Sequence, residues 1–244
     1  MSSELENKII GSDLCKLADL LQQYNLCSDV SPLQNAGILC LHSATEHSWE
    51  YSMAKMVFRA DEVGGRIPLE SEDFSVSLTV EIQGISLTDE LKDPLTKLFF
   101  DIEIEGIHSL DCRDLYASWH LDRHIGKSTD AKTKYSHPFY HFTFGGDKME
   151  CKGDMFGGTL ILPSPRIAYP PMDAILGIDF ILQNYLHKDQ LNAIIQDSEY
   201  TEIIRRAQER LLKPYFSSIM SYWDKATYTP VVDFSCNKLF PLFY

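Results

Sequence analysis

Two stretches near the middle of the chain alternate apolar and polar residues with a period of two. In "FSVSLTVEIQG" and "LFFDIEIEG" the apolar positions are Phe74, Val76, Leu78, Val80 and Ile82, followed by Phe100, Ile102 and Ile104. Such a period over this length is typical of strands with one buried face and one face in water. These stretches therefore predict an antiparallel sheet in the middle of the chain.

The alternating pattern extends on both sides of these stretches. It continues in "LYASWHLDRHI" and "HPFYHFTFGG", and the glycines of "GGDKMECKGDMFGG" are typical of hairpin turns. The short apolar runs "ILCLHSA" and "GGTLILPSP" also favour strands. Together they predict about six antiparallel strands joined as a meander.

The two ends of the chain have helical patterns instead. "SDLCKLADLLQQYN" predicts a short N-terminal helix that begins at Ser12 or Asp13, and "CSDVSPLQNAG" predicts a loop. "MDAILGIDFILQNYL" is apolar on nearly all sides, as in a buried helix. The amphipathic last third predicts helices that are capped at Ser198 and are kinked or divided at Pro214.

Strands followed by helices predict an α+β fold, in which the antiparallel sheet is packed by the buried helix and the C-terminal amphipathic helices. We expect one domain over residues 1–244. Its predicted parts are an N-terminal helical segment (1–35), a sheet region (36–165) and a C-terminal helical region (166–244).

The composition and the absence of certain motifs argue against several classes of function. No run of about 18 apolar residues is present, so we expect no membrane span, and the polar start "MSSELENKII" predicts a cytoplasmic protein. A net charge of −13 argues against a broad nucleic-acid-binding face. The six cysteines form no C-x-x-C pair, which favours reduced thiols. Phosphate-binding glycine motifs and a G-x-S-x-G motif are absent from the sequence.

Four of the eight histidines fall within two neighbouring predicted strands. Residues at i, i+2 and i+4 share one face of a strand, so His120, Asp122 and His124 share a face of the first strand, and His137 and His141 share a face of the second. If the two strands pair as a hairpin, all five side chains lie on one patch.

This patch allows three kinds of chemistry, and the sequence also allows a purely structural role. Imidazoles with Asp122 could bind a divalent transition metal, for which the candidate ligands are His120, Asp122, His124 and His141. The candidate catalytic residues for general acid–base chemistry are His120, His124, His137 and His141. An anionic ligand could instead be held by nearby cationic and hydroxyl groups, with Arg166 and Thr143 as candidates.

Two resemblances accompany these residues. "YHFTF", with His141 and Thr143, resembles the apolar-His-x-Thr strand motif of the two-histidine phosphoesterases, which need a second such motif; His120 has Asp122 at the matching offset. The run from "HPFYHFTFGG" through "LPSPRIAYPP" to "MDAILGIDFILQNYL" resembles small uncharacterised bacterial proteins associated with mobile-element and antiviral-defence genes. That resemblance implies no assigned activity.

The proline-rich segment holds Arg166 in a rigid path, which predicts an ion pair with Asp173 or Asp179 on the buried helix. The apolar C-terminal segment "FSCNKLFPLFY" either packs into the core or docks on another subunit. The sequence thus predicts a binding or assembly subunit of a cytoplasmic bacterial complex, for example in antiviral defence, with a protein partner or as a homo-oligomer. The alternative is a metal- or histidine-dependent phosphodiester hydrolase that uses the histidine patch.

Overall fold

The structure is a computed structural model that describes residues 3–43, 48–60, 70–86, 92–124, 137–150, 166–223 and 234–243. Within these ranges the elements follow one another as α1 (Ser3–Gln23), α2 (Ser31–His42), β1 (Ser48–Arg59), β2 (Ser71–Ile85), β3 (Leu95–His108), β4 (Arg113–Arg123), β5 (Tyr140–Phe144), α3 (Asp147–Glu150), β6 (Ile167–Ala168), α4 (Ala174–Tyr185), α5 (Lys188–Ile194), α6 (Ser198–Met220) and α7 (Cys236–Leu239).

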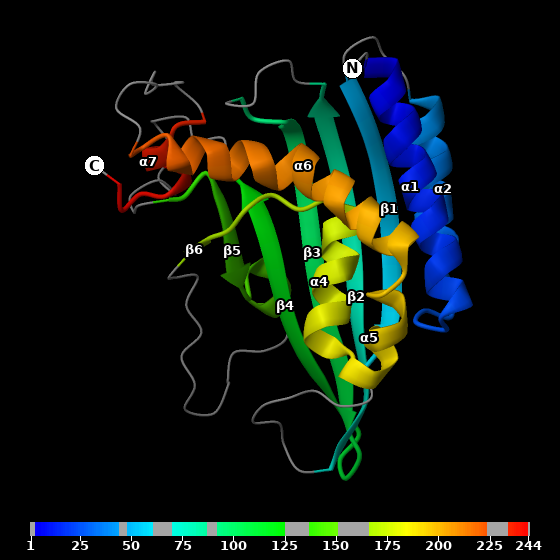
Figure 1. Cartoon of the computed structure of the whole chain (residues 1–244). Coiled ribbons are helices and arrows are strands. Elements are labelled where there is room, and N and C mark those ends of the chain that lie inside the picture. The colour runs from blue at the N-terminus through cyan, green and yellow to red at the C-terminus, as the bar shows by residue number, and fades with distance from the viewer. Residues whose placement is uncertain are drawn as a thin grey trace.

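The strands form one sheet in which each pairs with its neighbours along the chain, in the order β1-β2-β3-β4-β5-β6. Every pairing is antiparallel, which confirms the predicted α+β meander (Figure 1). The sheet begins later than the sequence predicted, because residues 31–42 are helical, and its last described strand, β6, follows Arg166. The strand predicted in "GGTLILPSP" lies outside the described residues.

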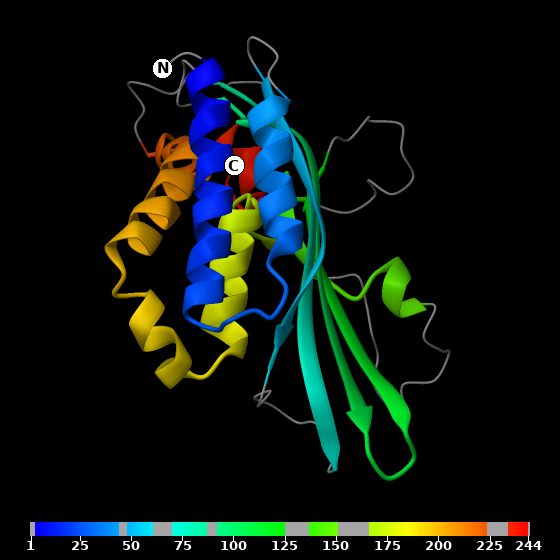
Figure 2. The same ribbon diagram turned by 90° about the vertical axis from the view of Figure 1, so that its right-hand side faces the viewer.

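The two faces of the sheet differ in the way the alternation predicted. Leu78 and Val80 of β2 lie opposite Ile102 and Phe100 of β3, and all four are buried. Figure 2 shows α1, α2, α4, α5 and α6 on this side of the sheet and α3 on the other. Gly177 lets α4 approach closely, since a Cβ there would lie 2.6 Å from the ring of Phe100. The opposite side of the sheet, here called the outer face, carries the polar residues that alternate with the buried ones along each strand.

The segment predicted as a loop followed by a strand is helix α2, so that prediction is wrong. Its buried residues Leu33, Ala36, Gly37 and Cys40 recur at helical spacing and pack toward the core. The sequence shows a continuous apolar run, which suggested a strand, because Leu39 and its neighbours on the exposed side of α2 are apolar as well. The N-terminal helix also begins earlier than predicted, at Ser3.

The predicted ion pair of Arg166 is also wrong. Asp173 caps α4 by accepting from the backbone N–H of Leu176 (2.9 Å), and its other oxygen accepts from Arg210 of α6 (2.6 Å). Asp179 accepts instead from the hydroxyl of Tyr200 (2.6 Å). The reason is that α6 folds back over α4 and brings a closer cation to the helix start.

Helix α6 departs from its prediction in two details. It is capped by Asp197 rather than by Ser198, because the Asp197 carboxylate accepts from the backbone N–H groups of Glu199 and Tyr200. It also continues through Pro214 as one element rather than being divided there. Pro214 is buried against the core, so packing compensates for the one helical hydrogen bond that proline removes.

Candidate functional site

The polar groups of the outer face are placed by strand register. His120 of β4 lies between Asp101 of β3 and Thr143 of β5, and Asp122 lies opposite His141. The intervening positions face the helices: Leu121 and Phe142 are paired with one another and buried. The predicted hairpin partnership of the two histidine-bearing segments is therefore present.

Asp122 lies between two imidazoles. Its Oδ2 is 3.1 Å from Nε2 of His120 and 3.4 Å from Nε2 of His141. The two imidazoles differ in exposure: the side chain of His141 is 1% exposed and that of His120 is 25% exposed. Burial alone would raise the pKa of Asp122, but hydrogen bonds from both imidazoles hold it well below its usual value.

The remaining two predicted histidines extend this arrangement. Nε2 of His137 is 3.1 Å from Nε2 of His141, and the rings of His124 and His137 stack with centroids 3.9 Å apart and planes 13° apart. Burial, together with the positive potential of His141, His124 and Arg166, lowers the pKa of His137 to about 4, so that ring is neutral at pH 7. The structure thus brings His120, Asp122, His124, His137 and His141 together; we call them the histidine cluster.

The hydrogen-bond partners of His141 fix the chemistry that its ring can offer. Its Nδ1 lies 3.0 Å from the carbonyl oxygen of Pro138, which can only accept, so Nδ1 carries a proton. Its Nε2 then faces the Asp122 carboxylate and the Nε2 of His137. Nε2 is thus the ring nitrogen that can bind either a proton or a metal ion beside these two groups. The cluster therefore has a place for a positive charge at Nε2.

The two candidate ligand-binding residues lie beside the cluster. Arg166 directly precedes β6 and is close enough to His137 to influence its pKa. Thr143 is buried, and its Oγ1 has no hydrogen-bond partner. Their ligand-binding role, like the catalytic and metal-binding roles of the histidine cluster, stays a prediction.

Two residues that support the outer face were not singled out from the sequence. Lys148 of α3 contacts Asp101 (2.8 Å) and Glu103 (2.6 Å), and these hydrogen bonds raise its pKa even though burial alone would lower it. Gly146 has φ 80° and lies against His120, where a Cβ would be 2.6 Å from Cε1 of the ring. The "FGGD" sequence signals a turn, but its contact with His120 depends on tertiary structure.

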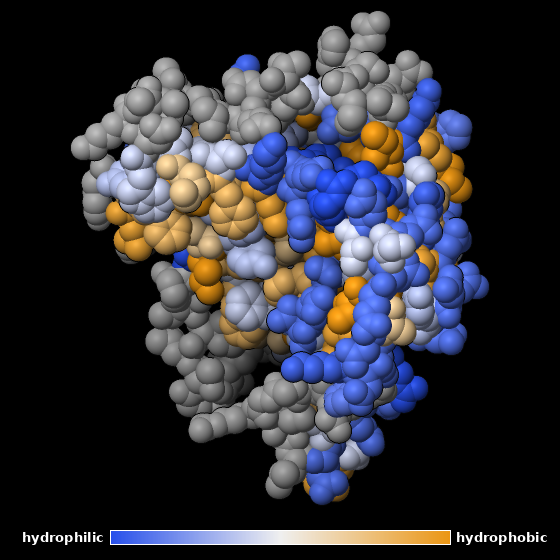
Figure 3. Space-filling view, in the orientation of Figure 1, coloured by the Kyte–Doolittle hydropathy of each residue, from blue (hydrophilic) through white to orange (hydrophobic). Residues whose placement is uncertain are grey.

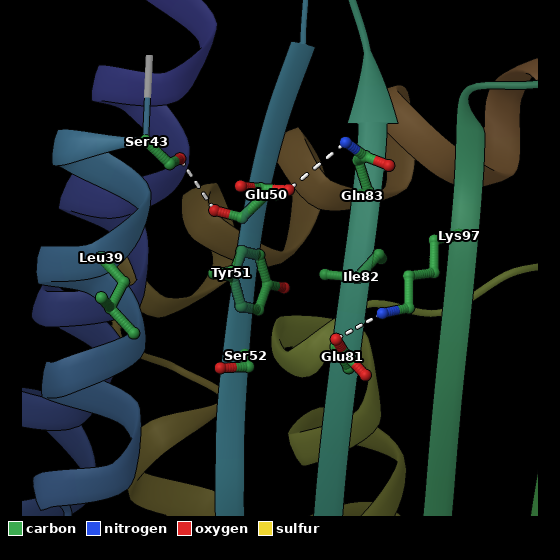
Figure 4. Close-up of a pocket in the computed structure, with 9 residues that line it drawn as sticks. All are labelled: Leu39, Ser43, Glu50, Tyr51, Ser52, Glu81, Ile82, Gln83 and Lys97. Carbon is green, nitrogen blue, oxygen red and sulfur yellow. Dashed lines mark hydrogen bonds and ion pairs between the residues drawn. The ribbon is translucent and has the colours of Figure 1, made fainter. Parts of the chain in front are cut away.

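A separate hollow of about 270 Å³ lies between α2 and the outer side of β1–β3 (Figure 4). Its polar side chains largely satisfy one another. Gln83 donates to Glu50 (3.3 Å), Lys97 pairs with Glu81, and Ser43 donates to the backbone oxygen of Glu50 (2.9 Å). We therefore do not place a functional site there.

Apolar side chains gather at the C-terminal end of α6 and the segment after α7. Phe216, Met220 and Trp223 follow one another at helical spacing, Trp223 contacts the ring of Phe243 (centroids 5.1 Å apart), and Leu242 precedes Phe243. We call Phe216, Met220, Trp223 and Leu242 the C-terminal surface. These four side chains are between 48% and 69% exposed. Figure 3 shows apolar atoms near the C-terminal half of α6 on the face turned to the viewer.

The prediction that the C-terminal segment packs into the core is confirmed for its first half, and docking on another subunit stays a prediction. Phe234 and Leu239 are buried in the core, and Cys236 is buried with them. Leu242, near the end of the same segment, is exposed. The segment is therefore anchored by its first half and presents its second half outward.

Within the described ranges, no group of three or more His, Cys, Asp or Glu side chains is arranged to hold a metal ion as it stands. Among the same residues, no helix is both long and apolar enough to cross a membrane. Comparison with models of known families, with curated proteins and with solved structures found no match to this chain. Function therefore has to be inferred from the geometry of the residues, and the two resemblances stay predictions.

Proposed function

We propose that this chain is a binding or assembly subunit of a bacterial cytoplasmic complex, and that the C-terminal surface is its main contact with a protein partner or a second copy. The observation that carries the proposal is the exposure of four neighbouring large apolar side chains in a chain whose net charge is −13. Scattered apolar residues are normal on protein surfaces, but contiguous ones mark contacts. The link to a bacterial complex, for example in antiviral defence, comes from the sequence resemblance.

The size of the C-terminal surface fits the centre of an interface. Four side chains of roughly 200 Å² each, about 60% exposed, give roughly 500 Å² of apolar area, at the upper end for the largest patch on a monomer. A stable interface buries roughly 800 Å² per partner. The patch would therefore form the apolar core of the contact, and a polar rim would supply the rest.

The test is to combine Met220→Asp with Trp223→Asp in the full chain and to measure mass by light scattering during gel filtration. We expect wild-type protein to form an oligomer or to require its partner, and the double variant to lose that association by at least about 30-fold, since a central Trp contributes about 2 kcal/mol or more. Leu110→Asp is the matched control, because Leu110 is 75% exposed in the distant β3–β4 turn. A wild-type chain that is monomeric and binds no partner would contradict the proposal.

The hydrolase alternative receives less support from the histidine cluster. A pair of catalytic imidazoles must both reach the substrate, but His141 is almost fully buried and has partners at both ring nitrogens. His120 is the more accessible member. Replacing His120 and His141 together by Ala should abolish any phosphodiesterase activity found in the wild type; retention of that activity would remove this alternative.

A further inference from the structure

We propose that the histidine cluster is a binding site for one divalent transition-metal ion, with zinc as the best match, held by His120, Asp122, His137 and His141. This set differs from the one that the sequence suggested. His137 replaces His124, because Nε2 of His137 is directed at Nε2 of His141, whereas the His124 ring stacks flat on His137.

The separations between the donor atoms support this site. In a tetrahedral zinc site with bonds of about 2.0–2.1 Å, neighbouring ligand atoms lie about 3.3–3.4 Å apart. The three consecutive separations here are 3.1 Å (His120 to Asp122), 3.4 Å (Asp122 to His141) and 3.1 Å (His141 to His137). Each is therefore within about 0.3 Å of the edge of a zinc tetrahedron.

The hydrogen-bond partners of His141 also support a metal site. Metal-binding histidines usually donate their second N–H to a carbonyl or carboxylate, as Nδ1 of His141 does to Pro138. That bond leaves Nε2 as the nitrogen that faces a carboxylate oxygen and a second imidazole nitrogen. Imidazole nitrogen and carboxylate oxygen are both ligands that zinc takes in proteins, so the groups that meet at Nε2 are of the type a zinc site needs.

As they stand, the four donor atoms form a chain in which each approaches the next, and no three of these described residues yet surround one point. Closing the chain requires movement of the donor atoms toward a common centre. Asp122 occupies the middle of the chain, and its side chain is 48% exposed, so it has room to rotate and offers an entry path for the ion.

The ligand set also predicts the role of the metal. Three imidazoles and one carboxylate suit zinc, and four protein ligands leave no position for water or substrate, as in structural rather than catalytic sites. The ion would join β4, β5 and the segment that begins at His137. We therefore expect it to stabilise this part of the sheet, independently of whether the C-terminal surface binds a partner.

The experiment uses the full chain, purified without a histidine tag and freed of metal, with zinc chloride as the probe. We expect titration calorimetry to find one zinc ion per chain, and zinc to raise the thermal unfolding temperature. Cobalt in place of zinc should give the visible absorption of a tetrahedral site. His137→Gln and Asp122→Asn should each weaken zinc binding by about 100-fold or more, given that even outer-shell changes weaken it by about 10–100-fold.

The matched control is His108→Gln, which removes another imidazole–carboxylate contact, that of His108 with Asp111 (2.5 Å), from the β3–β4 turn. It should leave zinc binding unchanged. His137 lies outside the strands, so His137→Gln is the variant to use if Asp122→Asn fails to fold. Zinc that does not bind wild type, or that binds wild type and both cluster variants equally, would overturn the proposal.

Discussion

Replacing Arg210 by Met would leave a buried carboxylate without its cation. The side chains of Arg210 and Asp173 are 8% and 0% exposed, and their contact is 2.6 Å long. The attraction is strong enough to raise the pKa of Arg210, although burial alone would lower it. Asp173 is also fixed by its hydrogen bond from Leu176, so it cannot turn toward water without uncapping α4.

The expected loss can be worked out from this geometry. Breaking a buried ion pair by removing one partner lowers the free energy of unfolding by about 3–5 kcal/mol. For a chain of this size each kcal/mol shifts the midpoint by about 2–4 °C, so Arg210→Met should lower the thermal midpoint by roughly 6–20 °C. The control is Arg205→Met on the same helix, where the ion pairs with Glu202 and Glu209 are exposed to solvent, so its loss should change the midpoint little.

A double-mutant cycle separates the charge from the packing. Asp173→Asn keeps an N-cap side chain on α4 but removes the charge, so it also leaves Arg210 unpaired. The double variant has neither buried charge, and we expect it to be more stable than Arg210→Met alone. Chemical denaturation of the four proteins measures the coupling. Losses that simply add in the double variant, or a loss below about 1 kcal/mol for Arg210→Met, would refute this account of the pair.

Three further predictions concern single residues. Thr143→Val should leave the free energy of unfolding unchanged or raise it by up to about 1 kcal/mol in chemical denaturation, because it removes a buried hydroxyl that has no partner; a clear loss would show that the hydroxyl is paired. Burial alone would raise the pKa of Glu103, but hydrogen bonds from Lys148 and Tyr116 lower it. These bonds therefore stabilise the fold above the unfolded pKa of about 4.5, and the stabilisation is lost as the pH falls through the lower folded pKa. Lys148→Met should therefore destabilise more at pH 7 than at pH 3 in denaturant titrations, and an equal loss at both would contradict this. Gly84→Ala places a Cβ 2.2 Å from the buried ring of Trp49 and should lower the free energy of unfolding by about 1–3 kcal/mol.

The sequence predicted the sheet well because strand alternation is a local signal that burial reinforces. Val80 and Phe100 were assigned to the buried face from sequence, and the structure places them opposite one another in the core. Helix α2 was misread because its apolar residues lie on two sides. Cys40 faces the core while Leu39 is exposed, so the local sequence shows a continuous apolar run rather than a helical stripe.

The candidate site was predicted in part for the same reason. The positions of His120, Asp122 and His141 follow from alternation and hairpin pairing, which local sequence can indicate. His137 was also expected on this patch, as part of the second strand, but it precedes β5 and contacts His141 from outside the strand pairing. Likewise, the pairing of Asp173 with Arg210 depends on how α6 folds back, and no local pattern specifies that.

The histidine cluster and the C-terminal surface are joined by one short segment. His137 and His141 flank Phe139, whose backbone N–H donates to the carbonyl of Lys238 in α7 (2.8 Å) and whose ring contacts Phe234 (centroids 6.3 Å apart). A metal ion held by the two histidines would restrain Phe139, and with it the anchored half of the C-terminal segment. Zinc should therefore strengthen association through the C-terminal surface in the wild type but not in His137→Gln, because only the wild type can transmit that restraint.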